Sequence, residues 1–95
     1  MNKVMLVTGG SRGIGAATVR LGAKRGYAVA INYQKRADFA QNLMDEINDG
    51  GGKAIIIQAN VSVETEIIEM FNQVDYQLGT LNAFVNNAGI IQPPR

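Results

Sequence analysis

The sequence predicts an α/β protein built on a parallel β-sheet, and two observations support this prediction. Four short apolar runs recur along the 95 residues, and they begin at Lys3, Tyr27, Lys53 and Leu81. Short, continuously apolar runs are typical of strands that are buried on both faces, as in parallel sheets. The runs begin 24, 26 and 28 residues apart, which leaves room for one helix between each pair of strands.

The first connecting segment predicts a helix that faces the sheet with Ile14, Ala17, Thr18 and Leu21, which follow the i, i+3, i+4, i+7 spacing. Gly26 comes after it as a helix stop. The second helix is expected to bury a stripe of three side chains, and a run of glycines ends it. These side chains are Phe39, Leu43 and Ile47.

The third connecting segment predicts a helix with Ser62 as its N-cap. Glu64 and Glu66 lie in its first turn, where the helix dipole favours negative charge, and Gly79 ends it. We expect one apolar stripe to face the sheet. Its members are Val63, Ile67, Met70, Phe71, Val74 and Leu78.

Right-handed crossovers between parallel strands then fix the topology. The expected strand order is 3-2-1-4, the N-terminal part of a Rossmann doubly wound parallel sheet. The first two helices should cover one face and the third helix the other. Ligands of such sheets bind where the direction of winding reverses, here between the first and fourth strands, at the carboxyl ends of the strands.

Composition narrows the classes of function. Nine basic and eight acidic residues give a net charge of +1, so no strong field favours nucleic acid or an anionic membrane. The chain has no Cys and no His, which excludes a thiol nucleophile and a Ser-His-Asp triad, and we predict no metal site. Its apolar runs, such as Ala54–Ile57, are too short for a membrane span, and the N-terminal run is too short for a signal peptide. We therefore expect a cytoplasmic protein.

A glycine-rich turn follows the first predicted strand directly. Residues 8–15 read TGGSRGIG, and a helix starts inside this segment. Glycines let the backbone turn sharply and let a pyrophosphate approach the amides, while the helix N-terminus supplies unpaired N–H groups. A strand, a glycine-rich turn and a helix in this order predict nucleotide binding. A P-loop is excluded, because no GxxxxGK[ST] pattern is present.

The spacing of Gly9, Gly13 and Gly15, with Thr8 in front, resembles the short-chain dehydrogenase/reductase family. The NNAG motif of residues 86–89, at the end of the fourth predicted strand, agrees with that family. The resemblance covers the whole chain but only the N-terminal part of the family's domain. Bacterial NADPH-dependent reductases of the ketoacyl-carrier-protein reductase and glucose dehydrogenase types look most similar.

The second predicted strand indicates which nicotinamide cofactor is bound. NAD-preferring proteins place an acidic residue there to hold the ribose diol, but this strand ends in Asn32-Tyr33, and Asp38 comes too late. The resemblance implies that a basic residue before the second glycine, here Arg12, accompanies NADP. We therefore predict NADP(H) rather than NAD(H), with Arg12 and the Ser11 hydroxyl at the 2′-phosphate. Lys35 and Arg36 either contact this phosphate or form a solvated loop.

The resemblance also implies roles near the other strand ends. Asn60 and Val61 would contact the adenine, although the family usually has Asp where Asn60 stands. Asn86 would tie neighbouring strands together, and Thr8 would brace the same loops. The full set of cofactor-binding residues that we predict is Gly9, Ser11, Arg12, Gly13, Ile14, Gly15, Tyr33, Asn60, Val61, Asn87, Ala88 and Gly89.

The family's catalytic Tyr-x-x-x-Lys pattern is absent, because none of the three tyrosines is followed four positions later by Lys. In the family these residues lie beyond the NNAG strand. We therefore expect residues 1–95 to be a partial NAD(P)-binding domain that lacks the catalytic part and is inactive alone. An incomplete reading frame, a truncated or cleaved product, and a deliberately isolated half all remain open as its origin. The parent protein is expected to be a homo-oligomer.

The predicted function is that of an NADP(H)-dependent short-chain oxidoreductase, which transfers a hydride between the nicotinamide and a carbonyl or alcohol carbon. This chain would supply the cofactor-binding half and no catalytic residue. The alternative is a non-catalytic dinucleotide-binding module or a truncated remnant. A methyltransferase-like nucleoside binder fits less well, because it requires an acid at the end of the second strand.

Overall fold

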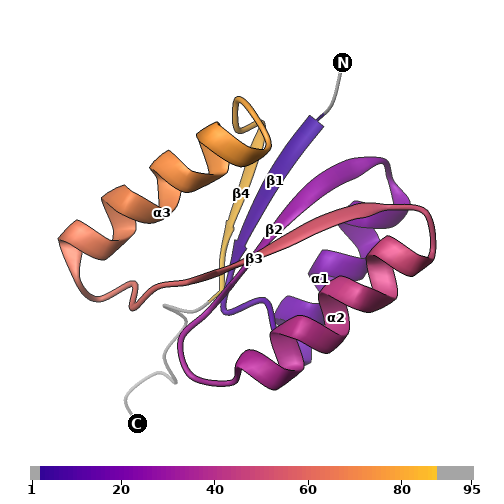
Figure 1. The fold of residues 1–95 in the computed structure, drawn as a ribbon, viewed down its shortest axis with the longest axis horizontal. Helices are drawn as coiled ribbons and strands as arrows, with labels where there is room; N and C mark the ends of the chain where they lie inside the picture. The colour runs from indigo at the N-terminus through magenta and orange to yellow at the C-terminus, as the bar shows by residue number, and fades with distance from the viewer. Residues whose placement is uncertain (1–2, 88–95) are drawn as a thin grey trace, which may run out of the picture.

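Strands and helices alternate along residues 3–87, the part of the chain that the computed structural model describes. The elements are β1 (Lys3–Thr8), α1 (Gly13–Lys24), β2 (Tyr27–Tyr33), α2 (Ala37–Asp49), β3 (Lys53–Gln58), α3 (Glu64–Gln77) and β4 (Ala83–Asn86). The four strands form one parallel sheet in the order β3-β2-β1-β4 (Figure 1). This confirms the predicted fold class and strand order. The first three strands begin at the predicted residues, and the fourth begins two residues later.

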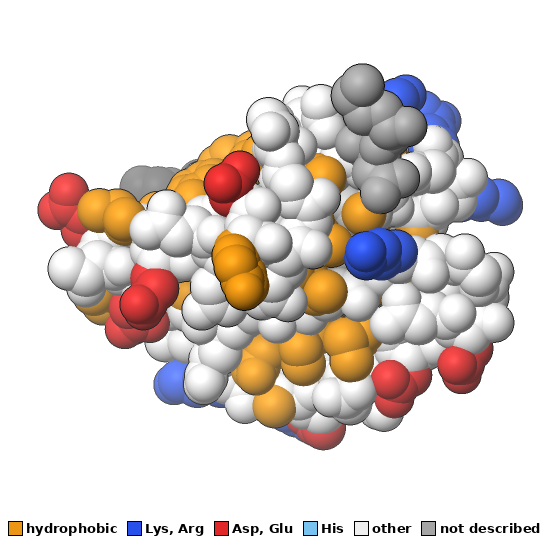
Figure 2. All heavy atoms as spheres, turned by 45° about the horizontal axis from the view of Figure 1, so that its top comes forward, with side chains coloured by type: hydrophobic (Ala, Val, Ile, Leu, Met, Phe, Trp, Pro, Cys, Tyr) orange, Lys and Arg blue, Asp and Glu red, His pale blue; other side chains and the backbone are white. Residues whose placement is uncertain are grey.

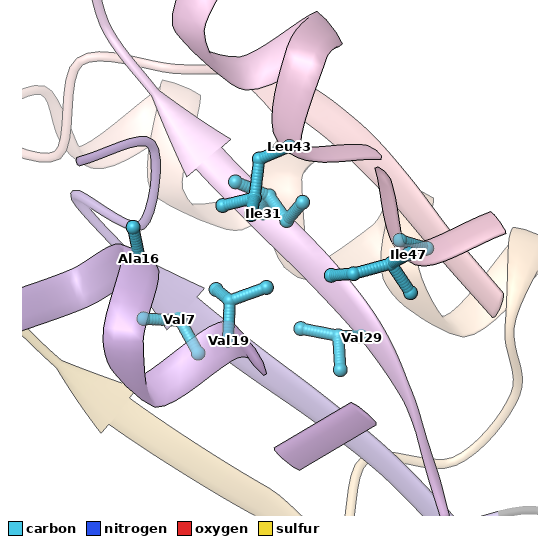
Figure 3. Close-up of a cluster of buried hydrophobic side chains, with 8 residues drawn as sticks. Val7, Ala16, Val19, Val29, Ile31, Leu43 and Ile47 are labelled. Carbon is cyan, nitrogen blue, oxygen red and sulfur yellow. The ribbon is translucent and has the colours of Figure 1, made fainter. Parts of the chain in front are cut away.

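The sheet lies between two helical layers. Helices α1 and α2 cover one face and α3 covers the other, as predicted (Figure 1). On the first face, Val19 of α1 and Leu43 and Ile47 of α2 lie beside Val29 and Ile31 of β2 (Figure 3). These contacts exclude water from β1 and β2, the strands whose carboxyl ends lie next to the glycine-rich turn.

The face by which α1 contacts the sheet differs from the prediction. Ile14 is 77% exposed and Leu21 is 50% exposed, so the predicted stripe points away from the sheet. The buried positions are instead Gly15, Ala16, Val19 and Gly22. The reason is that α1 approaches the sheet closely. A Cβ added to Gly22 would come within 2.7 Å of the Met5 sulfur, so small residues form the contact and the large ones stay outside.

Helix α3 also begins differently from the prediction. Its N-cap is Val63, and the Ser62 hydroxyl donates to Asn60 Oδ1 at 2.7 Å instead of capping the helix. Val63 is 37% exposed, so it lies outside the buried stripe. Met70 and Val74 are buried as predicted.

The surface carries both signs of charge, and Figure 2 shows red and blue side chains interspersed with small apolar groups on one face. This agrees with the net charge of +1. Within residues 3–87, no helix is long and apolar enough to cross a membrane.

The buried face of α1 can be tested with two variants of the same helix. Val19 is fully buried, so Val19→Ala removes packed methyl groups and should lower the free energy of unfolding by about 2 kcal/mol. Leu21→Ala deletes a larger side chain from the exposed face and should cost less than about 1 kcal/mol. Urea unfolding measures both values. The reverse order of the two costs would contradict the assignment of this face.

Candidate functional site

The turn between β1 and α1 has the backbone geometry of an anion site. Gly9 and Gly13 each have a φ of 62°, in the left-handed region that glycine adopts without strain. Arg12 is the N-cap residue of α1, and no side chain caps this helix in the described part of the chain. The N–H groups of the first helical turn have no carbonyl partner within the helix. They are therefore available to an oxygen of a phosphate.

Gly15 sets how closely α1 approaches the ends of β1 and β4. A Cβ at this position would overlap the carbonyl oxygen of Gly9 and would lie 2.9 Å from both Asn87 Nδ2 and the Gly10 Cα. Any side chain would therefore push the helix away from the turn. The glycine at this position of the motif thus has a packing reason that is independent of any ligand.

Asn32, at the end of β2, joins three segments of the chain. This residue is buried, with an exposed fraction of 2%. Its Oδ1 accepts from the Gly9 N–H at 3.1 Å, and its Nδ2 donates to the carbonyl oxygens of Ile57 at 3.3 Å and Ala59 at 3.2 Å. One amide thus fixes the glycine-rich turn to the ends of β2 and β3.

A second set of hydrogen bonds joins β1 to the NNAG segment. Thr8 Oγ1 donates to Asn86 Oδ1 at 2.9 Å and accepts from the backbone N–H of Asn87 at 2.9 Å. Asn87 Nδ2 donates to the Gly9 carbonyl at 3.1 Å. The structure thus contains the strand tie of Asn86 and the bracing by Thr8 that the sequence predicted. Asn87 in addition holds the glycine-rich turn.

Arg12 at the N-terminus of α1 and Arg36 at the N-terminus of α2 both lie next to the aromatic ring of Phe39. The Cζ atoms of Arg12 and Arg36 lie 5.7 Å and 4.0 Å from the centroid of Phe39. Arg36 also donates two hydrogen bonds to Asp38, at 2.9 Å and 3.1 Å, and these hold the pKa of the Asp38 carboxyl below its usual range. Of the two ion pairs in residues 3–87, neither includes Arg12. Arg12 therefore keeps its charge available beside the turn.

A cavity of about 300 Å³ lies between α1 and α2 at this corner. Ser11, Arg12 and Phe39 contribute to its lining, together with Arg20 and Glu46, which form an ion pair at 2.8 Å. The predicted 2′-phosphate residues Ser11 and Arg12 thus line one cavity, and neither Lys35 nor Arg36 contributes to its lining.

Asn60 holds the turn that leads into α3. Its Oδ1 accepts from both the N–H and the hydroxyl of Ser62, at 3.0 Å and 2.7 Å, and its N–H donates to Glu66. An adenine amino group would have to replace one of these donors, because an amide oxygen offers two lone pairs. Val61 borders a cavity of about 240 Å³ that Phe71 and Phe84 also line.

The remaining predicted residues lie in different settings. Tyr33 ends β2, and its carbonyl accepts from the Ala59 N–H at 3.0 Å, so its backbone helps to pair the strand ends. Ile14 lies exposed in the first turn of α1. Ala88 and Gly89 lie outside the described residues.

Two contributors to the site were not predicted as such from the sequence. The sequence pattern indicates Asn32 only as a strand end without a carboxylate, and Phe39 only as part of an apolar stripe. The sequence signal for Asn32 is a polar residue at the end of an otherwise apolar strand. No local signal identifies Phe39, because its contact with Arg12 joins two helices.

The fold and this edge of the sheet together define a Rossmann-type nucleotide-binding protein, because the glycine-rich turn, the uncapped helix and the switch point between β1 and β4 coincide. The family model for short chain dehydrogenases matches residues 3–95. The chain therefore belongs to the short-chain dehydrogenase/reductase family of oxidoreductases, as its motifs indicated.

Individual relatives support this family assignment. The uncharacterized oxidoreductase YgfF of Escherichia coli is 50% identical over 88 residues, which cover 93% of this chain and 36% of YgfF. The 3-oxoacyl-[acyl-carrier-protein] reductase FabG of Staphylococcus epidermidis is 46% identical, over 95% of this chain and 37% of FabG. The homologue YusS of Bacillus subtilis is 41% identical, over 95% of this chain and 83% of YusS. The chain thus spans little more than a third of YgfF and FabG but most of YusS.

Solved structures show the same fold. A dehydrogenase/reductase from Sinorhizobium meliloti has a TM-score of 0.89 and 42% identity, over 93% of this chain and 35% of its own. A blue fluorescent protein from a metagenomic library, solved in complex with NADPH, has a TM-score of 0.89 and 40% identity, over 95% of this chain and 37% of its own.

The role of Asn32 leads to a stability prediction. Asn32→Ala leaves the Gly9 N–H and two carbonyls of the β3 end without this partner, so the free energy of unfolding should fall by about 2–4 kcal/mol. Asn42→Ala, on the exposed side of α2, is the matched control and should change stability by less than about 0.5 kcal/mol. Equal effects of the two variants in urea unfolding would contradict the role of Asn32.

The close packing around Gly15 leads to a second stability prediction. Gly15→Ala forces α1 away from the turn and should cost about 1–3 kcal/mol of stability, as overpacking does. Gly50→Ala is the control, because a Cβ there lies 3.4 Å from its nearest neighbour and should be tolerated. Thermal unfolding of both variants is the measurement, and a Gly15→Ala protein as stable as wild type would refute the close approach.

Proposed function

We propose that this chain is the cofactor-binding part of a cytoplasmic NADP(H)-dependent oxidoreductase of the short-chain family. The complete protein would transfer a hydride between the nicotinamide and a carbonyl or alcohol carbon, and would be a homo-oligomer. The observation that carries the preference for NADP(H) is the position of Arg12. It lies at the N-terminus of α1 outside both ion pairs of residues 3–87, while β2 ends without a carboxylate.

The residues present fit such a cofactor. The turn of Gly9 and Gly13 and the N-terminus of α1 suit the pyrophosphate, because both glycines have a positive φ and no side chain caps the first N–H groups of this helix in the described part of the chain. Arg12 and Ser11 suit a 2′-phosphate through charge-assisted hydrogen bonds. Arg36 lies at the same corner, and a phosphate would compete with Asp38 for it.

We also propose that residues at the carboxyl ends of the strands contact the cofactor. Asn60 and Val61 would lie beside the adenine, and Tyr33 would also contact the cofactor. Asn87, Ala88 and Gly89 would pass along the nicotinamide ribose and the pyrophosphate. Asn87 supports this role because its side chain already holds the Gly9 carbonyl, so a ligand at the turn would adjoin it.

The chain's own residues would bind and orient the cofactor. The nicotinamide, when bound, supplies or accepts the hydride. No general acid or base is proposed among residues 1–95, because no tyrosine is followed four positions later by Lys. We therefore propose that these residues form a partial domain and that they have no oxidoreductase activity alone.

A second candidate is a non-catalytic dinucleotide-binding module or a remnant of a longer protein. The coverage of YusS, 83% of whose length this chain spans, favours it, because a curated relative of similar length exists. The two candidates differ in one assay. A module binds the cofactor without needing further residues, whereas the half of an enzyme gains hydride-transfer activity when the rest of the domain is supplied.

Arg12→Ala tests the cofactor preference. Loss of a charge-assisted contact to the 2′-phosphate should weaken NADPH binding roughly tenfold to a hundredfold. NADH binding should stay within about twofold, because NADH lacks this phosphate. Calorimetric titration of wild type and variant with both nucleotides is the measurement.

Arg25→Ala is the matched control, because Arg25 is an exposed arginine at the opposite end of the same helix. It should change neither affinity. An unchanged ratio of NADPH to NADH affinity in Arg12→Ala would contradict the proposed preference.

A further inference from the structure

We propose that Phe39 is a positioning residue for the 2′-phosphate, because its ring holds the guanidinium groups of Arg12 and Arg36 at one corner of the site. This inference rests on the proposed preference for NADP(H). It assigns a specificity role to an aromatic side chain that lies outside the glycine-rich turn and outside the strand ends.

The geometry is that of one ring shared by two helix starts. Arg12 is the N-cap residue of α1 and Arg36 is the N-cap residue of α2. Phe39 lies in the first turn of α2, and its ring centroid is 4.0 Å from Arg36 Cζ and 5.7 Å from Arg12 Cζ. The same ring borders the cavity of about 300 Å³ that Ser11 and Arg12 line. Phe39 is thus the contact that the two cations have in common.

The contact between the Phe39 ring and the two arginines has two physical effects. Two guanidinium groups repel each other, and the negative face of an aromatic ring attracts both. A long arginine side chain that samples many rotamers must be ordered when a ligand binds, and prior stacking reduces that cost. A ring in this place therefore favours the arrangement that a doubly charged phosphate requires and does nothing for a ribose hydroxyl.

The contact with the ring also matters because Asp38 competes with a 2′-phosphate for Arg36. Asp38 holds Arg36 by two hydrogen bonds in this structure. A 2′-phosphate must draw the guanidinium away from this carboxylate. The ring contact does not depend on the carboxylate, so it keeps Arg36 at the corner while the partner changes.

Phe39→Leu tests the proposal, since Leu keeps an apolar side chain at this half-buried position but removes the ring. NADPH affinity should fall roughly threefold to tenfold, and NADH affinity should stay within about twofold. Phe39→Tyr keeps the ring and should retain the wild-type ratio of the two affinities. Tyr76→Leu also removes an aromatic ring, from the exposed side of α3, and should leave the ratio unchanged.

A second measurement reads the arginines directly, in the absence of any nucleotide. The side-chain Nε–Hε resonance of Arg36 should move toward the position of an exposed arginine in Phe39→Leu, while that of Arg25 stays in place. Phe39→Met serves in the same two measurements where Phe39→Leu folds poorly, which circular dichroism reports.

The outcomes separate this inference from the function on which it rests. A wild-type chain that binds NADPH and NADH equally contradicts the proposed cofactor preference and the role of Phe39 together. A wild-type preference for NADPH that survives unchanged in Phe39→Leu overturns the role of Phe39 alone. A ratio that falls in Phe39→Leu and returns in Phe39→Tyr supports both.

Discussion

The geometry at the carboxyl ends of the strands depends on the hydrogen bonds of the buried Asn32 amide. Backbone groups at the end of a parallel sheet lose their ladder partners, and a buried one must find another. Asn32 supplies partners for the Gly9 N–H and for the carbonyls of Ile57 and Ala59. The glycine-rich turn is thereby fixed relative to the ends of β2 and β3. A carboxylate in the same buried place could accept from Gly9 but could not donate to the carbonyls.

The second constraint is the close approach of α1. Small residues form its contact with the sheet, and Gly15 leaves no room for a side chain between the turn and Asn87. This approach brings the positive end of the helix to the switch point between β1 and β4, where a family of NAD(P)-dependent oxidoreductases would be expected to place the pyrophosphate. The proposed pyrophosphate site thus coincides with packing that the chain needs in order to fold. We propose that Arg12 and its surroundings, which this packing does not require, add the preference for one nicotinamide cofactor.

The sequence predicted the sheet well because continuous apolar runs and helix-length spacing depend on local composition. Strand order followed from crossover handedness, and the glycine-rich turn from its position between a strand and a helix. The buried face of α1 was predicted wrongly, because a stripe of large apolar residues was preferred to one containing Gly15 and Gly22, and close packing selects the small ones. Ser62 was expected to cap α3, but its hydroxyl binds Asn60. The network of Asn32 and the ring contacts of Phe39 join segments far apart in the sequence, and no local pattern encodes them.

We propose that the cofactor binds at the carboxyl ends of the strands against the N-terminus of α1. Backbone amide chemical-shift mapping of the ¹⁵N-labelled chain during titration with NADPH tests it most directly. We expect saturable shifts at the amides of residues 11–15 and at Asn60, Val61 and Asn87, with little change in the C-terminal turns of α1 and α3. Saturable shifts confined to the cavity beside Phe71 and Phe84, or no saturable shift from a folded chain, would contradict this binding site.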